Sequence, residues 1–179
     1  MAEADVPRRK TATITFRFDE ELIEKLQHAA KEHQVSTNTL ATQAMRRFLE
    51  WDIYQPRIGM VGLNKAVFVK IFENLKEKEV VDLARTIGKD EMRDVALFMK
   101  GAIDTTSFMS WFEVQMVNSS VQVSHMSDNG THTYVMKHEL GKNWSIYNKT
   151  VLELIFEELF HKKIDVKYNK NTFVLRFSD

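Results

Sequence analysis

The alternation of apolar and polar positions predicts a short strand near the N-terminus. In the stretch TATITFRF, residues 11–18, every second side chain is apolar: Ile14, Phe16 and Phe18. A two-residue period places alternate side chains on opposite faces of a β-strand. No second strand pattern follows for about the next hundred residues, and a lone strand cannot satisfy its own backbone N–H and C=O groups. The strand must therefore pair with a distant part of its own chain or with a second chain.

Two helical patterns follow this strand. Asp19 is a suitable N-cap, and the acidic residues after it favour the positive end of a helix dipole. Apolar residues recur at helical spacing through about Lys31, and the sequence EHQV forms a turn before Ser36 or Thr37 caps a second helix. The second helix has this apolar set: Leu40, Ala41, Ala44, Met45, Phe48 and Leu49.

The chain divides after these helices. Pro56, Gly59 and Gly62 lie close together, which predicts a linker over residues 52–62. Residues 63–179 then predict a separate α+β domain. Its expected elements are helices at 65–75, 79–87, 90–99, 105–117 and 143–161, and antiparallel hairpins at 121–138, with an Asn129-Gly130 type I′ turn, and 164–177.

One long pattern resembles the ribbon-helix-helix superfamily of MetJ/Arc-type DNA-binding proteins. It is the sequence ITFRFDEELIEKLQHAAKEHQVSTNTLATQAMRRFLE. The resemblance covers about residues 10–51, and residues 11–51 would form the domain. It implies that two chains pair their strands into an antiparallel ribbon, which enters the DNA major groove, and that four helices share one core. The implied dimer core consists of Ile14, Phe16, Phe18, Leu22, Leu26, Leu40, Ala44, Met45 and Phe48.

The polar face of the predicted strand carries Thr13, Thr15 and Arg17. By family position these residues are the base readers. Arginine can contact guanine O6 and N7 with two hydrogen bonds, and threonine can bond a base edge or touch a thymine methyl. The alternative is the solvated face of an ordinary edge strand.

The start of the second helix and the N-terminal arm are the predicted phosphate contacts. No acidic residue occurs from Val35 to Leu49, so the helix dipole and its free N–H groups are left to an anion. The family clamps a backbone phosphate here, and the corresponding residues are Ser36, Thr37 and Asn38; a plain N-cap is the alternative. A basic, flexible arm is expected over residues 1–10, with these cations: Arg8, Arg9 and Lys10.

One departure from the family pattern is the turn between the helices. The family often has a glycine there in a left-handed conformation, whereas this chain has His33 and Gln34. A non-glycine residue with positive φ costs roughly 1 kcal/mol. A local difference in the turn is therefore expected, away from the base readers.

Composition restricts the partners. The chain has 25 Lys+Arg and 25 Asp+Glu, and its first fifty residues carry 8 of each sign, which counts against a nucleic-acid partner. The absence of cysteine excludes disulfides and thiolate metal sites. No signal peptide and no apolar run of about 18 residues is present, so a cytoplasmic protein is expected.

No enzyme is predicted, because the chain has no GxSxG, HExxH, phosphate-binding loop or GxGxxG motif. No cofactor is predicted either. His125, His132 and His138 share one face of the first hairpin and are weak candidates for a transition-metal site. A surplus of large apolar residues, including Phe68 and Trp144, indicates a subunit contact or a pocket for an apolar ligand.

The patterns together predict a prokaryotic-type, sequence-specific transcription regulator, most simply a repressor. It binds double-stranded DNA as a homodimer, and its C-terminal domain oligomerises the protein, to a tetramer for example, or senses a small-molecule effector. Two other functions stay open: a ribbon-helix-helix unit that only dimerises the C-terminal domain, and an antitoxin or plasmid-maintenance factor. A metal-dependent enzyme would need histidines or carboxylates that converge in a cleft.

Overall fold

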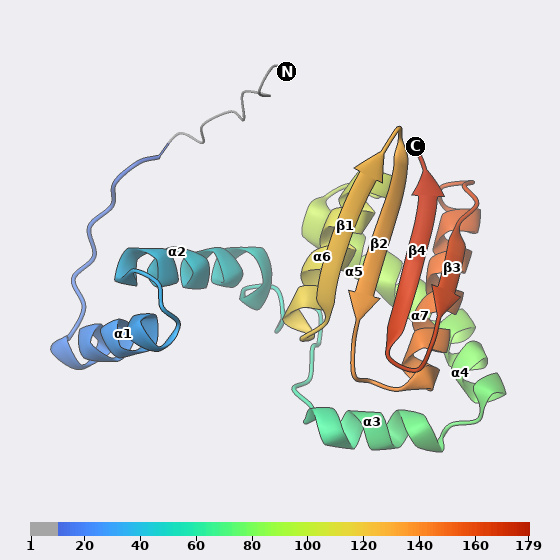
Figure 1. Ribbon diagram of the computed structural model, residues 1–179, viewed down its shortest axis with the longest axis horizontal. Helices are drawn as coiled ribbons and strands as arrows, with labels where there is room; N and C mark the ends of the chain where they lie inside the picture. Colours follow the sequence, from blue (N-terminus) through green and yellow to red (C-terminus); the bar gives the residue numbers. More distant parts are fainter. Residues whose placement is uncertain (1–10) are drawn as a thin grey trace. The chain divides into compact units, whose positions relative to one another are not determined.

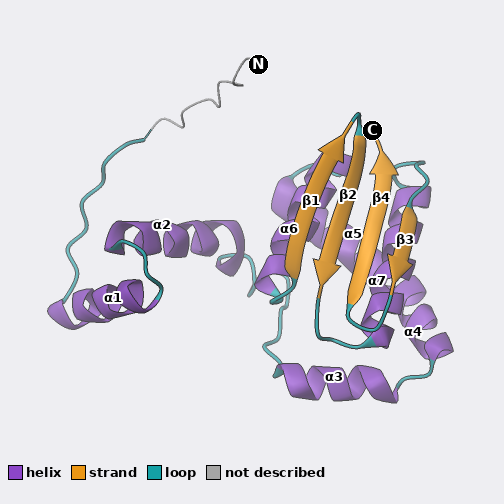
Figure 2. Ribbon diagram, viewed as in Figure 1, coloured by secondary structure: helices purple, strands orange, loops and turns teal. Residues whose placement is uncertain are grey.

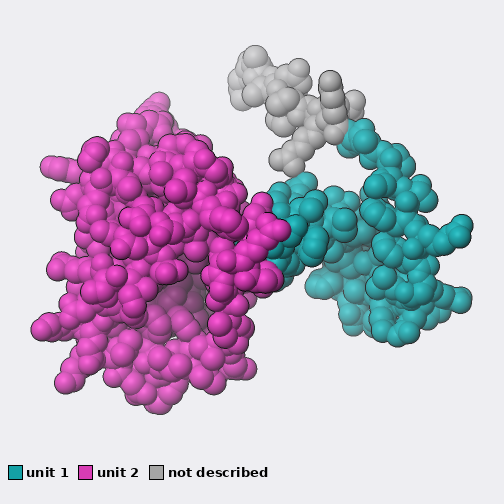
Figure 3. All heavy atoms as spheres, turned by 180° about the vertical axis from the view of Figure 1, so that it is seen from behind, with its two compact units in different colours: residues 1–53 teal, residues 54–179 magenta. Residues whose placement is uncertain are grey.

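The computed structural model describes residues 11–179. The chain forms two compact units, which we call unit 1, ending at Ile53, and unit 2, Tyr54–Asp179 (Figure 3). Helices and antiparallel strands are both present, which confirms the predicted α+β class. Among the described residues, no helix combines the length and the apolar character needed to cross a bilayer.

Unit 1 consists of an irregular segment and two helices. Residues 11–19 form neither helix nor strand within the chain. α1 spans Glu20–Glu32, α2 spans Thr37–Arg47, and the π-helix η1, Phe48–Asp52, continues from α2 (Figure 1). Both predicted helices are confirmed. The predicted strand has no strand partner within the described part of the chain.

The turn between α1 and α2 has the backbone geometry that glycine adopts most easily. Gln34 has φ 55°, in the left-handed region. Its N–H donates to the carbonyl of Lys31 at 3.1 Å, and the N–H of Val35 donates to the carbonyl of Ala30 at 3.0 Å. The turn is therefore left-handed at a glutamine, although the side chain makes this conformation less favourable than it is for glycine.

Unit 2 begins with helices that follow the predicted spans closely. The expected helix at 79–87 is α4 continued by a π-helix. Gly88, at its end, lies so close to Tyr147 that a Cβ at this position would overlap the tyrosine hydroxyl. The helices of unit 2 are α3, Lys65–Asn74; α4, Glu77–Leu83; η2, Ala84–Gly88; α5, Lys89–Lys100; α6, Thr105–Asn118; and α7, Lys142–Glu158.

Both predicted hairpins are confirmed, and they join into one antiparallel sheet in the order β1-β2-β4-β3. Asn129 and Gly130 have φ 47° and 73°, as a type I′ turn requires. α7 connects the two hairpins. β4 pairs with β3 of its own hairpin and also with β2 of the first hairpin. The strands are β1, Gln122–Asp128; β2, Thr131–Lys137; β3, Asp165–Tyr168; and β4, Thr172–Ser178.

The core of unit 2 lies between this sheet and the helices behind it, α5, α6 and α7 (Figure 2). Its largest fully buried side chains include Phe108, Trp111 and Phe112 of α6, together with Phe156 of α7 and Phe173 of β4. One face of the sheet therefore packs as a two-layer α/β core.

The apolar surplus on α7 is mostly core rather than subunit contact. α7 contacts β3 and β4 as well as α3, α4 and α5, so it is covered on more than one side. A helix in that position is apolar around most of its circumference. Its buried apolar residues are Trp144, Ile146, Val151, Leu152, Ile155 and Phe156.

Candidate nucleic-acid interface

Residues 11–19 are exposed along their whole length, including the three predicted base readers Thr13, Thr15 and Arg17. The rings of Phe16 and Phe18 stack with their centroids 5.6 Å apart. These rings therefore lie on the same side of the segment, as the two-residue period requires, and the side chain between them belongs to the other side.

The predicted dimer core is not buried within one chain. Ile14 is 73% exposed, Phe16 50% and Phe48 49%. Within α1 and α2 the only buried residue is Ala30. Of the predicted core residues, Leu26 and Leu40 are half-buried, and the rest are exposed: Ile14, Phe16, Phe18, Leu22, Ala44, Met45 and Phe48.

Among the described residues of unit 1, only Ala30 and Trp51 are buried, which is a small core. Burying one such leucine, methionine or phenylalanine side chain stabilises a fold by about 1.5–3 kcal/mol, and a unit of this size needs several of them. The apolar residues of α1 and α2 therefore require a surface that packs against them.

The two helix starts differ in charge. At α1, Asp19 Oδ1 accepts the N–H of Leu22 at 2.8 Å, and two glutamates occupy the first turn. At α2, Ser36 Oγ accepts the N–H of Thr39 at 3.0 Å, and no acidic residue is in the first turn. Anions are attracted to the positive end of a helix that carries no carboxylate of its own. Of the two, only the α2 start suits a phosphate.

The first two residues of α2 keep their backbone donors free. Within residues 11–179, the N–H groups of Thr37 and Asn38 have no acceptor. Both residues lie beside Ser36, so the structure brings the predicted phosphate-binding trio together at one helix end. The other predicted phosphate contacts, Arg8 to Lys10, lie outside the described residues.

Cations at the C-terminal end of α2 were not among the predicted site residues. Arg46 and Arg47 occupy its last turn and are exposed, and Arg47 Nε lies 3.4 Å from Asp52 Oδ1. In the sequence, the pair could have been found as the two cations of the run from Val35 to Leu49 that contains no acidic residue.

Comparison of the chain with models of known protein families and with curated proteins gives no match. The resemblance to ribbon-helix-helix proteins therefore depends on the residues of unit 1 alone.

The three histidines of the first hairpin share a sheet face but do not converge. His125 Nε2 and His132 Nδ1 are 3.0 Å apart, and His132 Nε2 is 2.9 Å from Asp179 Oδ1. His138 is buried at the other end of the strand, with Nε2 2.8 Å from Ser145 Oγ. Across residues 11–179, no group of three or more histidines and carboxylates is placed to hold a metal ion.

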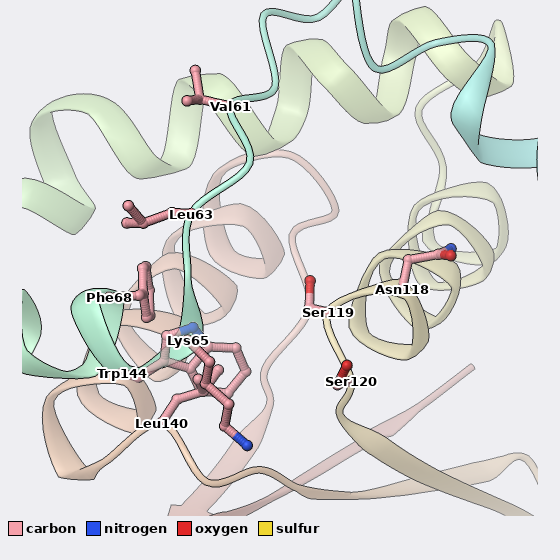
Figure 4. Close-up of a pocket in the computed structure, with 9 residues that line it drawn as sticks. All are labelled: Val61, Leu63, Lys65, Phe68, Asn118, Ser119, Ser120, Leu140 and Trp144. Carbon is pink, nitrogen blue, oxygen red and sulfur yellow. The ribbon is translucent and has the colours of Figure 1, made fainter.

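Unit 2 contains a pocket of about 330 Å³ that includes Phe68 and Trp144, two residues of the apolar surplus (Figure 4). Its other residues come from segments far apart in the sequence, so no local pattern could have assembled it. On one side lie Val61, Leu63 and Phe68, and on the other lie the last residue of α6 and the two serines that follow it. The lining residues are Val61, Leu63, Lys65, Phe68, Asn118, Ser119, Ser120, Leu140 and Trp144.

Proposed function

We propose that the protein is a sequence-specific DNA-binding regulator of ribbon-helix-helix type, most simply a repressor. Two chains pair residues 11–18 as an antiparallel ribbon. The observation that carries the proposal is an alternating, unpaired segment followed by two helices on which large apolar side chains such as Leu22 and Met45 are exposed in a single chain. A second copy gives the ribbon its backbone hydrogen bonds and buries the side chains of Phe16 and Phe18.

The ribbon presents Thr13, Thr15 and Arg17 to the base edges, because they alternate with the core-facing phenylalanines. The start of α2 binds a backbone phosphate through the free N–H groups of Thr37 and Asn38. Phosphate contacts fix the register of the dimer on DNA, and the ribbon supplies the choice of sequence.

The direct test is DNA binding over a range of salt, with duplexes from upstream of the protein's own gene and a scrambled duplex as reference. The triple variant Thr13→Ala/Thr15→Ala/Arg17→Ala should lose its preference for the specific duplex while remaining a dimer. Each bidentate base contact discriminates by about 1–3 kcal/mol, so the loss for each copy of Arg17 is about 5- to 150-fold.

Lys25→Ala is the matched control, because it removes one exposed cation of α1 outside the ribbon. It should leave the sequence preference unchanged. A triple variant that keeps the full preference, or a wild-type protein that binds no duplex at low salt, would refute base reading by the ribbon.

The isosteric substitution Asn38→Asp tests the phosphate contact separately. A carboxylate in the first turn stabilises the helix by about 0.3–1 kcal/mol, yet it repels a phosphate at the same place. The variant should therefore unfold less easily and bind all duplexes more weakly. Unchanged DNA affinity would show that the α2 start is only an N-cap.

A second candidate function is dimerisation without DNA binding, with unit 2 as the functional part. Its support is charge: residues 11–53 carry five Lys+Arg and seven Asp+Glu. In that case the triple variant and the wild-type protein would behave alike with every duplex, while both remained dimers.

A further inference from the structure

The pocket in unit 2 is closed on one side by residues 60–64, which we call the connector because they lie between unit 1 and α3. Val61 and Leu63 line the pocket, although the two residues are 83% and 52% exposed. Within residues 11–179, the backbone groups of Val61, Gly62 and Leu63 make no hydrogen bond to the protein. Hydrogen bonds of Met60 and Asn64 hold the two ends of the connector, so its middle three residues can attach to unit 2 only through side chains that face the pocket.

The pocket has walls of different chemistry. Figure 4 shows Val61, Leu63 and Phe68 on one side, with Trp144 at the base. Trp144 is nearly buried, so the pocket exposes only a small part of it. This wall suits an alkyl chain or an aromatic ring. The volume is at the small end of the range of about 300–1,000 Å³ for ligand pockets, which implies a metabolite-sized ligand.

The opposite wall offers polar groups. Ser119 and Ser120 lie where α6 ends, and within the described chain their hydroxyls have no hydrogen-bonding partner. Ser120 has φ 61°. This left-handed residue redirects the chain from α6 into β1 and so leaves both serines beside the pocket.

Lys65 gives the pocket a cation. Its Nζ lies 2.7 Å from Glu139 Oε2, and this hydrogen bond lowers the pKa of the Glu139 carboxyl below its usual value. The pair is largely solvent-exposed, with side chains 48% and 76% accessible. Solvent screens an exposed ion pair and makes it weak, so another carboxylate can replace Glu139 at little cost.

We propose that this pocket binds a small monocarboxylate with an apolar body, and that the bound ligand holds the connector against unit 2. The apolar body packs on Trp144, Phe68 and Leu63. The carboxylate takes the place of Glu139 at Lys65. Since residues 54–59 are all that separates the connector from unit 1 along the chain, such a ligand is an effector of DNA binding; this last step rests on the proposed function, whereas the binding itself does not.

The test uses phenylacetate as the probe and phenylacetamide as its uncharged counterpart, each titrated calorimetrically into the full-length protein. Saturable binding of phenylacetate, tighter than that of the amide, is expected. Hydrogen exchange at residues 60–64 should slow when phenylacetate is added. Lys65→Met should weaken phenylacetate binding by up to about fivefold, and Leu63→Ser should weaken binding of both probes.

Lys70→Met is the control, because it removes a cation from the same helix without touching the pocket. It should bind like the wild type. The proposal is overturned if neither probe saturates, if the amide binds as tightly as the acid, if both lysine variants lose affinity equally, or if exchange at 60–64 is unchanged.

Binding of phenylacetate is measured without DNA, so the two proposals fail separately. A protein that binds its operator but not the probe retains the regulator function and refutes the pocket. A protein that binds the probe but no duplex supports the pocket and refutes DNA regulation. Where both bind, phenylacetate should change the DNA affinity of the wild type and not that of Leu63→Ser.

Discussion

Phenylalanines lie in opposite environments in the two units. Phe112 in unit 2 is completely buried, with its ring centroid 6.0 Å from that of Phe108. Phe16 and Phe18 in unit 1 stack on each other but remain about half exposed. The apolar pattern of unit 2 is satisfied within one chain, whereas that of unit 1 needs another surface.

The same difference holds for the backbone. In residues 122–128 and 131–137 successive side chains lie on opposite faces of the sheet, and the two segments pair as β1 and β2. Each later strand also pairs with a strand of the same sheet. Residues 11–18 alternate as regularly but have no strand partner in the described chain. Alternation of apolar and polar residues therefore indicates where a strand can form. Whether the strand forms depends on a second strand with which it can pair.

A matched pair of truncations gives the largest expected contrast. Phe112→Ala should lower the free energy of unfolding of unit 2 by about 3–5 kcal/mol, because it leaves a cavity in a packed core. Phe18→Ala should leave the stability of unit 2 unchanged and weaken self-association of the chain. Urea unfolding followed by tryptophan fluorescence measures the first effect, and sedimentation velocity measures the second.

Thr15→Ala is the control for self-association, since Thr15 lies in the same segment but on the other side of the predicted ribbon. It should associate like the wild type. If Thr15→Ala and Phe18→Ala weaken association equally, the two-residue period does not describe the contact between copies.

The next largest expected effect is a loss of stability of unit 2 at acidic pH. Burial disfavours the charged ring of His138, and Lys65 repels it, so the pKa of His138 falls from 6.5 to about 4. Its Nδ1 accepts the N–H of Leu140 at 3.2 Å, which leaves Nε2 to donate to Ser145 Oγ. The neutral ring is thus the form that the fold accommodates.

The direction of the pH effect follows from these values. Between about pH 6.5 and pH 4 the unfolded chain binds a proton at His138 and the folded chain does not, so the stability of unit 2 falls as the pH falls. The total loss is about 3 kcal/mol. His138→Asn, which keeps an acceptor for the Leu140 N–H, should be less stable at pH 7 and should lack this part of the pH dependence. A variant with the wild-type slope in this window would assign the slope to another group.

The local features of the fold were predictable from the sequence. Asp19 and Ser36 cap their helices as expected, and Asn129-Gly130 forms the expected turn. These signals depend on residues within a few positions of one another, and so do the helical periods of unit 2.

Features that depend on distant residues were not predictable in the same way. The position of β4 beside β2 follows from α7 packing across the sheet, which no hairpin pattern specifies. The pocket combines residues 61–68, 118–120 and 140–144, and its lysine, Lys65, is not part of a recognisable sequence motif. For unit 1 the sequence does predict a candidate site, because a ribbon and two helix starts are short, local patterns; their contact with DNA stays a prediction.

The smallest expected effect lies in the turn of unit 1. Gln34→Gly relieves the left-handed strain but makes the unfolded chain more flexible, so each chain gains about 1 kcal/mol at most. If unit 1 folds only as a dimer, both chains contribute, and association tightens by up to about thirtyfold. Gln34→Ala keeps the strain and serves as the control in the same sedimentation experiment. A gain in helix content by circular dichroism with unchanged association would show that unit 1 folds by itself, and the contrast between the two units would then concern exposure only.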